Sequence, residues 1–381
     1  MAEKIRIMHV TGALKVGGVD ELLLITAKYN LAHKYDLAFT ACDTSDGYMG
    51  QQIQNLGYKT FSLGISTRVY DLRLIPRLVK VLKEYQPHIV HFYFKISFLG
   101  RIAAKLAGVP IIISNEVDIG WEDYSFGLRI AAMLKRKMDF LIDKAIPCSE
   151  AVRTYWDKNN SSKYVTIYLP IDLEKFAPLK RQPSEEGYKN GNYPVIGIVS
   201  RVHPGKGHED LIRAMTKILE VFPKARLRII GTGPLLEEMQ NLSKSLNLNG
   251  AVEFTGFVED LYPELSALDV FVLPSLTEGF PLSVMEAMAM GLPVAATPVG
   301  GVPEMVEPGQ TGLLFPPKSP DGLADAVLQI LSDPKKARKM GEQGRQKVFK
   351  EYRPEKYIQQ LDSLYQELLA AKGVCKQEQF A

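Results

Sequence analysis

The sequence predicts an α/β protein made of two doubly wound domains, each built on a parallel sheet covered by helices. Three observations support this prediction. Short apolar runs alternate with helical stretches, the alternation stops near Ala177 and begins again, and 381 residues exceed the size of one ordinary domain. Short apolar strands joined by helices imply crossover connections, which belong to parallel sheets buried on both faces.

The first cycle of strands and helices fills the chain up to about residue 113. A glycine-bearing loop, Gly12–Gly18, follows its first strand and leads into a helix. Apolar runs predict strands, and periodic stretches between them predict helices. The expected elements are strands Ile5–Val10, Leu37–Ala41, Thr60–Leu63, Ile89–Phe94 and Ile111–Ile113, and helices Gly47–Leu56, Ile75–Tyr85 and Phe98–Ala107.

A polar, turn-forming stretch after Ala177 separates this cycle from a second one. We therefore expect an N-terminal domain at residues 1–176 and a C-terminal domain at residues 177–354. The second cycle has expected strands Val195–Val199, Ala225–Ile230, Val252–Phe254, Val270–Leu273 and Pro293–Ala296, and expected helices His208–Val221, Leu235–Leu246, Leu261–Ala267 and Leu282–Met290. The tail is helical from Lys335 to Ala371, and its apolar stripe predicts that residues 355–372 pack back on the first domain.

Composition and charge narrow the class of protein. The chain is 46% hydrophobic and 23% charged, as in soluble globular proteins, and its formal charge is only +3. A dedicated nucleic-acid binder usually carries a larger basic excess. Cys42, Cys148 and Cys375 lie far apart and form no ligand-spaced cluster. Without a signal peptide or membrane-spanning run, the chain is expected to be cytoplasmic, with no nucleic-acid partner.

The stretch from residue 273 to residue 286 carries the strongest candidate chemistry. A strand ends, a loop turns at residues 278–281, and a helix begins. Pro281 suits the first helical position because its missing N–H would have no intrahelical partner. The free amides of Leu282 and Ser283 then point out of the helix start, which makes an anion site.

Two carboxylates flank this helix start. Glu278 precedes it, and Glu286 stands eight residues later with its side chain directed back toward it. Carboxylates are natural acceptors for vicinal sugar hydroxyls, so a pair around a diphosphate site fits a nucleotide sugar. The alternative is that both are ordinary acids favoured by the helix dipole.

A cationic loop, Ser200–Gly207, directly follows the expected strand Val195–Val199. Arg201 offers a planar fork of donors and Lys206 a point charge, and together they can neutralise a diphosphate leaving group. Such a pair would stabilise the departing phosphate electrostatically. The alternative is two solvated cations on a surface loop.

Two glycine turns are weaker signals. Gly231 and Gly233 lie between a strand and a helix, but the third glycine of the dinucleotide fingerprint is missing, so a packing turn near the site is the simpler interpretation. Gly17 and Gly18 hold the corresponding place in the first domain, where glycine lets the backbone approach a ligand. A turn without a ligand is the alternative there.

Taken together, five ordered motifs resemble the retaining glycosyltransferases of the GT-B fold, family four. These motifs are Ser200-Arg201 with Lys206-Gly207, Gly231-Thr232-Gly233-Pro234, Phe254-Thr255-Gly256-Phe257-Val258, Glu278-Gly279-Phe280-Pro281 with Glu286-Ala287, and Gly300-Gly301-Val302-Pro303-Glu304. The resemblance covers almost the whole chain and is strongest from about Val195 to Phe315. It implies two Rossmann-like domains facing across a cleft, with the acceptor in the first and the nucleotide sugar in the second.

The resemblance implies a role for each matched position. Arg201 and Lys206 would hold the donor diphosphate. Glu278 would contact the transferred sugar and Glu286 the ribose hydroxyls. The other donor contacts that it implies are Gly17, Gly18, Gly231, Gly233, Phe257, Val258, Gly279, Phe280, Pro281, Leu282 and Ser283. It also implies transfer with retention, usually without a divalent metal, and no Asp-x-Asp motif occurs here. We therefore expect neither a metal nor another cofactor.

One position departs from the family pattern. Many members carry a histidine near the sugar after the strand that corresponds to Ile111–Ile113, whereas this chain continues with Ser-Asn-Glu-Val-Asp at residues 114–118. Glu116 is the candidate there, because a carboxylate can orient a hydroxyl or take up its proton. Asn115 and Asp118 remain alternatives, and so does an ordinary acid at a strand end.

Two nearby histidines are not expected to bind a metal. His88 and His91 are separated by two residues in strand-like sequence and have no third ligand near them in the sequence. Structural roles are the expectation for both.

A basic amphipathic stretch, Phe126–Lys144, includes Arg129, Lys135, Arg136 and Lys137. Such a helix can lie on anionic lipid, and the alternative is a domain helix with a solvated basic face. Because many family members act on lipid-linked glycans, peripheral contact with the inner face of an anionic membrane is a hypothesis for this chain.

The expected activity is transfer of a hexose or N-acetylhexosamine from a nucleoside-diphosphate sugar to a glycan, lipid-linked or small-molecule acceptor. A uridine diphosphate sugar is the starting assumption, and polysaccharide or cell-envelope biosynthesis is the expected setting. The alternatives are a sugar-nucleotide epimerase or hydrolase of the same fold, and a non-catalytic subunit that binds nucleotide sugars. The motifs predict neither the oligomeric state nor the identity of donor and acceptor.

Overall fold

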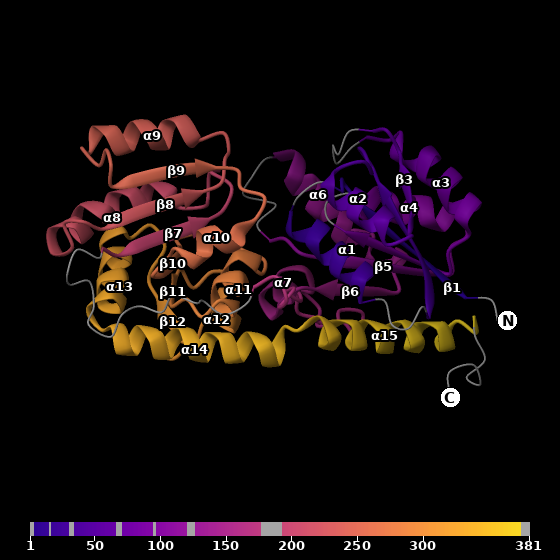
Figure 1. Ribbon diagram of the computed structural model, residues 1–381. Helices are drawn as coiled ribbons and strands as arrows, with labels where there is room; N and C mark the ends of the chain where they lie inside the picture. Colours follow the sequence, from indigo (N-terminus) through magenta and orange to yellow (C-terminus); the bar gives the residue numbers. More distant parts are fainter. Residues whose placement is uncertain are drawn as a thin grey trace. The chain divides into compact units, whose positions relative to one another are not determined.

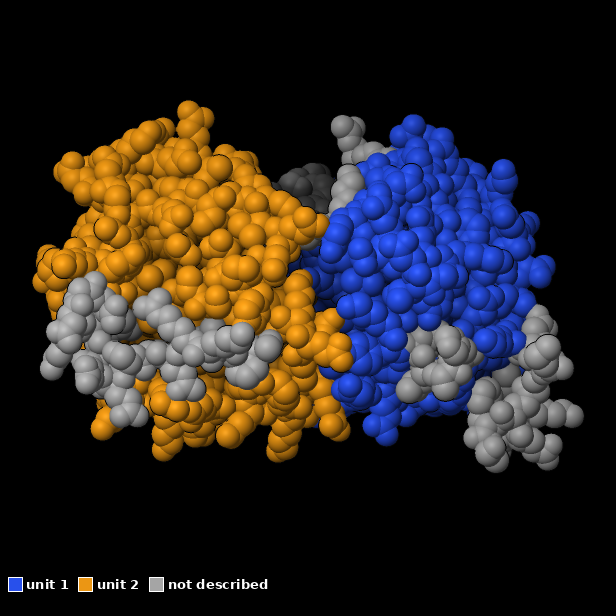
Figure 2. Space-filling model, viewed as in Figure 1, with its two compact units in different colours: residues 1–170, 354–381 blue, residues 171–353 orange. Residues whose placement is uncertain are grey.

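The computed structural model describes residues 4–14, 17–29, 34–65, 71–93, 97–119, 126–176 and 193–374. The chain divides into two compact units (Figure 2). Unit 1 contains residues 1–170 and 354–381, and unit 2 contains residues 171–353. Each unit is built on one six-stranded sheet of parallel strands.

The sheet of unit 1 has the strand order β3-β2-β1-β4-β5-β6. Its strands are β1 (Ile5–Thr11), β2 (Tyr35–Ala41), β3 (Lys59–Ser62), β4 (Ile89–Tyr93), β5 (Ile111–Glu116) and β6 (Lys144–Pro147). The central strand β1 pairs Ile7 with Leu37 on one side and with Ile89 on the other. All three side chains are buried, because helices cover both faces of the sheet (Figure 1).

The helices of unit 1 connect successive strands, and one of them comes from the end of the chain (Figure 1). They are α1 (Gly18–Lys28), α2 (Tyr48–Asn55), α3 (Leu74–Tyr85), α4 (Ser97–Leu106), α6 (Phe126–Lys137), the 3₁₀ turn η3 (Asp139–Leu141), α7 (Glu150–Trp156) and α15 (Pro354–Ala371). The stripe Tyr357, Leu361, Leu364, Tyr365 and Leu368 of α15 is buried in this unit. The amphipathic tail thereby obtains its partner surface.

The sheet of unit 2 has the order β12-β11-β10-β7-β8-β9. Its strands are β7 (Val195–Val199), β8 (Arg226–Ile230), β9 (Val252–Gly256), β10 (Val270–Leu273), β11 (Val294–Ala296) and β12 (Gly312–Leu314). Renumbered within the unit, this order is 6-5-4-1-2-3, and both sheets therefore have the doubly wound order 3-2-1-4-5-6. The predicted fold class is confirmed.

The helices of unit 2 are α8 (His208–Val221), α9 (Leu236–Ser245), α10 (Leu261–Ser266), α11 (Leu282–Ala289), α12 (Val302–Met305), α13 (Pro320–Ser332) and α14 (Pro334–Glu351). Helix α8 packs against α9 and α13, and α14 packs against α11. One apolar cluster under these helices joins Ile198 of β7 and Val272 of β10 to Leu211 of α8 and Val327 of α13.

The structure differs from the sequence expectation at several elements. The predicted helical tail is two helices, because Pro354 lacks the amide needed to continue α14 into α15. The elements β6, α7, α12, β12 and α13 have no counterpart among the elements predicted from the sequence. Strand β5 continues to Glu116, three residues beyond its predicted end. The prediction stopped short because Ser114, Asn115 and Glu116 are polar, although all three are buried.

Candidate functional site

The candidate donor site lies in unit 2, at the carboxyl edge of its sheet. Strands β7 and β10 are neighbours there, and the chain leaves them toward opposite sides, to β8 and to β11. Ligands of doubly wound folds bind at such a switch point. The two loops meet, since the amide of Leu276 donates to the carbonyl oxygen of Gly205 at 2.7 Å. Residues after β7 and β10 are thereby brought together.

Glycines allow these loops to approach one another closely. A Cβ on Gly207 would lie 2.0 Å from the carbonyl oxygen of Pro274, and the φ of Gly207 is +71°. A Cβ on Gly231 would lie 2.1 Å from the carbonyl oxygen of Ser200, and one on Gly233 would lie 2.2 Å from that of Val202. Only glycine fits such contacts without moving the backbone. The turn Gly231–Gly233 is thus packed on the cationic loop.

The central contact of the site joins the cationic loop to the acidic motif. Lys206 Nζ donates to Glu278 Oε1 at 2.6 Å. The Glu278 side chain is only 9% exposed, whereas that of Lys206 is 25% exposed. An ammonium group has three N–H donors, of which Glu278 accepts one. The pair therefore presents a cation to the carboxyl edge of the sheet beside an oriented carboxylate.

Ser275 completes this contact, although it is not among the site residues predicted from the motifs. Its hydroxyl donates to the same Glu278 Oε1 at 2.6 Å, and its own carbonyl oxygen accepts the hydroxyl of Thr297 at 2.5 Å. Ser275 and Thr297 are both fully buried. The glutamate is thus held by two donors, one of which is anchored to the loop after β11. The signal for Ser275 in the sequence is its place three residues before Glu278.

The start of α11 lies directly beyond Glu278. The expectation that Pro281 occupies the first helical position is wrong, because its ψ of 112° is extended and α11 begins at Leu282. The first two amides of α11 still have no intrahelical acceptor, so the anion-binding character of this end is kept. Glu286 is buried in the helix, and the ring of Phe280 packs on Tyr352 at 5.3 Å between centroids.

The remaining predicted donor contacts lie at two places. Arg201 is exposed after β7, while Phe257, 61% exposed, and the half-buried Val258 follow β9 in unit 2. These residues share the carboxyl edge with Lys206. Gly17 and Gly18 are exposed at the start of α1 in unit 1, after β1.

His208 supports the cationic loop from the first turn of α8. Its Nε2 lies 3.2 Å from Ser200 Oγ, and the side chain is buried. Burial, together with the charge of Lys206, lowers the pKa of His208 to about 4. The ring is therefore neutral near pH 7 and adds no third cation to the loop.

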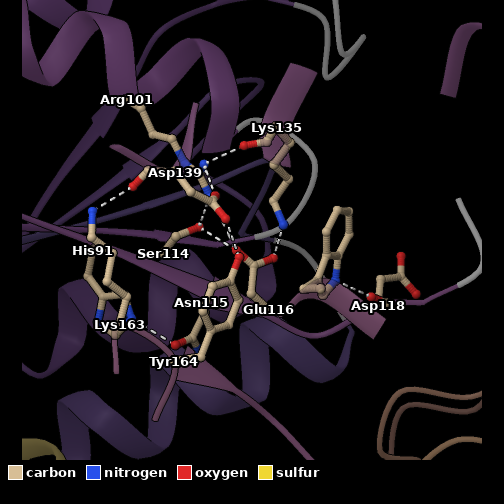
Figure 3. A network of polar contacts seen from close by, with 11 residues as sticks. His91, Arg101, Ser114, Asn115, Glu116, Asp118, Lys135, Asp139, Lys163 and Tyr164 are labelled. Atoms are coloured by element: carbon tan, nitrogen blue, oxygen red, sulfur yellow. Dashed lines mark hydrogen bonds and ion pairs between the residues drawn. The ribbon is translucent and has the colours of Figure 1, made fainter. Parts of the chain in front are cut away.

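Glu116 occupies a different environment from the free carboxylate that the sequence hypothesis requires. It ends β5 in unit 1, is 3% exposed, and pairs through Oε2 with Lys135 (Figure 3). Its Oε1 accepts from Ser114 Oγ at 2.9 Å and lies 3.4 Å from Arg101 Nη2. Both oxygens are engaged by protein donors, which favours a positioning role over proton uptake from a substrate.

The neighbouring candidates are also hydrogen-bonded. Asn115 Oδ1 accepts from His91 Nε2 at 2.8 Å, and the Nδ1 of His91 lies 3.0 Å from the hydroxyl of Tyr365. The carbonyl oxygen of Asp118 accepts from Trp156 Nε1 at 2.9 Å. His88 accepts the amide of Arg6. Within the described ranges, no three His, Cys, Asp or Glu side chains gather into a metal site.

This fold and site define a glycosyltransferase of the GT-B type, and the comparisons agree. Residues 16–175 match the model of Glycosyltransferase Family 4, and residues 180–347 match that of Glycosyl transferases group 1. The chain belongs to this family, family four of the glycosyltransferases. The predicted resemblance is confirmed.

Three similar proteins are named or were solved with different sugar nucleotides. A GDP-mannose-dependent alpha-(1-6)-phosphatidylinositol monomannoside mannosyltransferase of Mycobacterium tuberculosis (strain CDC 1551 / Oshkosh) is 32% identical over 66% of this chain and 68% of its own. A UDP-Gal:alpha-D-GlcNAc-diphosphoundecaprenol alpha-1,3-galactosyltransferase of Escherichia coli is 27% identical over 97% of this chain and 98% of its own. HepE of Anabaena, whose crystal structure was solved in complex with UDP-glucose, shares the fold with a TM-score of 0.80. It is 22% identical, and the match covers 95% of this chain and 100% of HepE.

Proposed function

We propose that the protein transfers a hexose or N-acetylhexosamine, with retention of configuration, from a nucleoside-diphosphate sugar to a glycan, lipid-linked or small-molecule acceptor. The observation that carries the proposal is the cluster of Lys206, Glu278 and Ser275 beside the start of α11. It combines a cation and free helix amides, which suit a diphosphate, with a fixed carboxylate, which suits sugar hydroxyls.

The chemistry follows from this arrangement. In the transfer, the acceptor hydroxyl oxygen bonds to the anomeric carbon and releases its proton while the bond from that carbon to the diphosphate oxygen breaks, so additional negative charge develops on the leaving diphosphate. Lys206, Arg201 and the amides of Leu282 and Ser283 would stabilise that charge. Glu278, held by Ser275, would orient the sugar hydroxyls relative to the breaking bond. Glu286 would bind the ribose, and the loop Gly256–Val258 would border the base.

Variants of the central pair test the proposal. Lys206→Ala and Glu278→Ala should each lower turnover by about 100-fold or more, because loss of one fixed electrostatic group at a developing charge commonly has an effect of that size. Lys217→Ala is the matched control, since Lys217 lies in the same unit on an exposed face of α8 and pairs with Asp325. Near-normal rates in either site variant would refute the site assignment.

Product analysis separates the alternatives. Incubation of the donor sugar without acceptor would reveal an epimerase or a hydrolase as epimerised or free sugar. Binding without turnover over a broad panel of donors and acceptors would favour a non-catalytic subunit. The anomeric coupling in the NMR spectrum of the first product formed reports retention or inversion directly. An inverted product would refute the retaining proposal.

The donor base is best found by a thermal-shift screen, because a ligand that binds the native state raises its unfolding temperature. The printed names of the two relatives contain GDP-mannose and UDP-Gal. The screen should therefore compare uridine, guanosine and adenosine diphosphates and their sugars. We propose that no metal or other cofactor is needed, so turnover should be unchanged by EDTA.

We also propose a peripheral contact with an anionic membrane through α6 and η3. Their exposed side includes Phe140 (73%), Met133 (48%) and Ile130 (36%), with Arg129 and Lys137 beside them. Apolar side chains flanked by cations suit the surface of an anionic bilayer. No helix in the part of the chain that the structure describes is long and apolar enough to cross a membrane.

Vesicle sedimentation tests this contact. The protein should sediment with vesicles that contain anionic lipid at low salt, and Phe140→Ser should weaken binding. Leu72→Ser is the control, because Leu72 is 67% exposed elsewhere in unit 1. Absence of binding at low salt, or an equal loss in both variants, would refute the proposed surface.

A further inference from the structure

The side chain of Lys135 is buried in unit 1, at the last turn of α6. Its ammonium group is ion-paired with Glu116 Oε2 (Figure 3). The same group lies 3.4 Å from the centroid of the Trp156 ring. A charged amine leaves water at a considerable cost in free energy unless such partners are fixed around it. The ring face of a tryptophan is attractive to a cation at this distance.

The groups around Lys135 form a charge-balanced cluster of two cations and two anions. Arg101 of α4 is fully buried and donates to Asp139 Oδ1 of η3 at 2.8 Å and to the carbonyl oxygen of Lys135 at 3.0 Å. Glu116 of β5 lies between the two cations, and Tyr164 donates its hydroxyl to Asp139. The cluster thus joins β5, α4, α6 and η3 through side chains that take part in no step proposed for the donor.

Lys135 also contacts both supports of the segment that follows β5. Glu116 is the last residue of that strand, directly before the half-buried residues 117–119. Trp156 of α7 donates its Nε1 hydrogen to the carbonyl oxygen of Asp118 at 2.9 Å. A single ammonium group therefore contacts both Glu116, which directly precedes the segment, and Trp156, which is hydrogen-bonded to the middle residue of the segment.

We propose that Lys135 is a positioning residue for acceptor binding, because its charge holds Glu116 and Trp156 and thereby fixes the backbone of residues 117–119 and the end of α6. This inference rests on the proposed function and on the implication of the family resemblance that unit 1 receives the acceptor. It assigns Glu116 to the same positioning cluster. The segment belongs to the carboxyl edge of the sheet of unit 1, where doubly wound domains bind their ligands.

Burial makes the charge of Lys135 costly in free energy. Burial, more than any neighbouring charge, lowers the pKa of Lys135 from 10.5 to about 8, while Glu116 raises it and Arg101 lowers it. A lysine whose folded pKa is below its unfolded pKa opposes folding in its charged form, and this cost is relieved as the pH rises from about 8 to 10.5. Lys135→Met removes this cost but leaves the buried Glu116 without one of its two cationic partners, so this single replacement should destabilise the fold. Replacing both members of the pair, as in Lys135→Met with Glu116→Gln, should come closer to the stability of the parent.

Tryptophan fluorescence tests the contact without any assay of activity. The sequence contains two tryptophans, so Trp121→Phe leaves Trp156 as the only reporter. Between pH 6.5 and 9, its emission should change with a midpoint near 8, because the ammonium group over the ring loses its charge. Lys135→Met should abolish the transition. Lys137→Met, an exposed change in the same helix, should keep it. A transition that persists in Lys135→Met, or is absent in the parent, would overturn the assignment.

Steady-state kinetics test the consequence. Lys135→Met should raise the KM for the acceptor about tenfold, as a misplaced binding segment does, while the KM for the donor and kcat change less than about twofold. Its thermal midpoint should lie below that of the parent, because Glu116 loses a cationic partner, and should recover in part when Glu116→Gln is added. A fall in kcat with unchanged acceptor KM would contradict the positioning role. Absence of any glycosyl transfer would refute the proposed function, whereas the fluorescence transition tests the Lys135 contact separately.

Discussion

The close packing of α14 on the end of α11 makes a sharp prediction about two glycines of one helix. Gly341 and Gly344 both lie inside α14 and are both buried. A Cβ on Gly341 would lie 1.9 Å from the carbonyl oxygen of Gly291, the residue in left-handed conformation that follows α11. A Cβ on Gly344 would meet nothing closer than the Met288 side chain at 3.5 Å. The two substitutions by alanine should therefore have opposite effects.

The magnitudes follow from these distances. Alanine in place of glycine inside a helix contributes roughly 0.5–1 kcal/mol to stability, and Gly344→Ala should show this gain. In Gly341→Ala the backbone at Gly291 must move by more than ~1 Å, and overpacking of this kind costs about 1–3 kcal/mol after relaxation. The two variants should thus differ by roughly 1.5–4 kcal/mol in the free energy of unfolding, with Gly341→Ala less stable than the parent.

Urea denaturation followed by circular dichroism measures this difference, and thermal midpoints should follow the same order. A change of 1 kcal/mol corresponds to about 2–4 °C for a unit of this size. Because α14 supports the helix whose start forms the donor site, Gly341→Ala should also weaken the thermal shift produced by the donor nucleotide. Equal stability of the two variants would refute the reasoning.

Three further predictions concern the donor site and the pH dependence. Ser275→Ala removes one of the two donors to Glu278 and should lower kcat/KM about tenfold, while Ser275→Thr should restore much of it in the same assay. Gly207→Ala places a Cβ 2.0 Å from the Pro274 carbonyl oxygen at a φ of +71°, so donor affinity, measured by calorimetry, should be lost. Burial lowers the pKa of His91 to about 4 from 6.5. The unfolded chain therefore binds more protons in this window, and the urea midpoint should fall as the pH is lowered from about 6.5 toward 4, with a contribution of roughly 1.4 kcal/mol per pH unit from this histidine. A midpoint equal at pH 7 and pH 5 would contradict this reasoning.

The sequence by itself determined the fold class, because alternation of apolar strands and helices is a local pattern. Strands such as Val195–Val199 and helices such as His208–Val221 coincide with their predicted bounds. The order of the motifs also determined the family, and the comparisons confirm it. Where the pattern failed, the cause was a buried polar residue, as in β5, or a proline whose effect depends on its neighbours, as at Pro354.

Only the tertiary structure decided which charges are paired. Lys206 and Glu278 lie 72 residues apart, and their contact depends on β7 and β10 being neighbours in the sheet. The burial of Glu116 depends on Arg101 and Lys135, which reach it from two helices. The sequence shows which residues are acidic or basic. The free-energy cost of removing a charge from water, and the partner that compensates for that cost, depend on the packing around the charge.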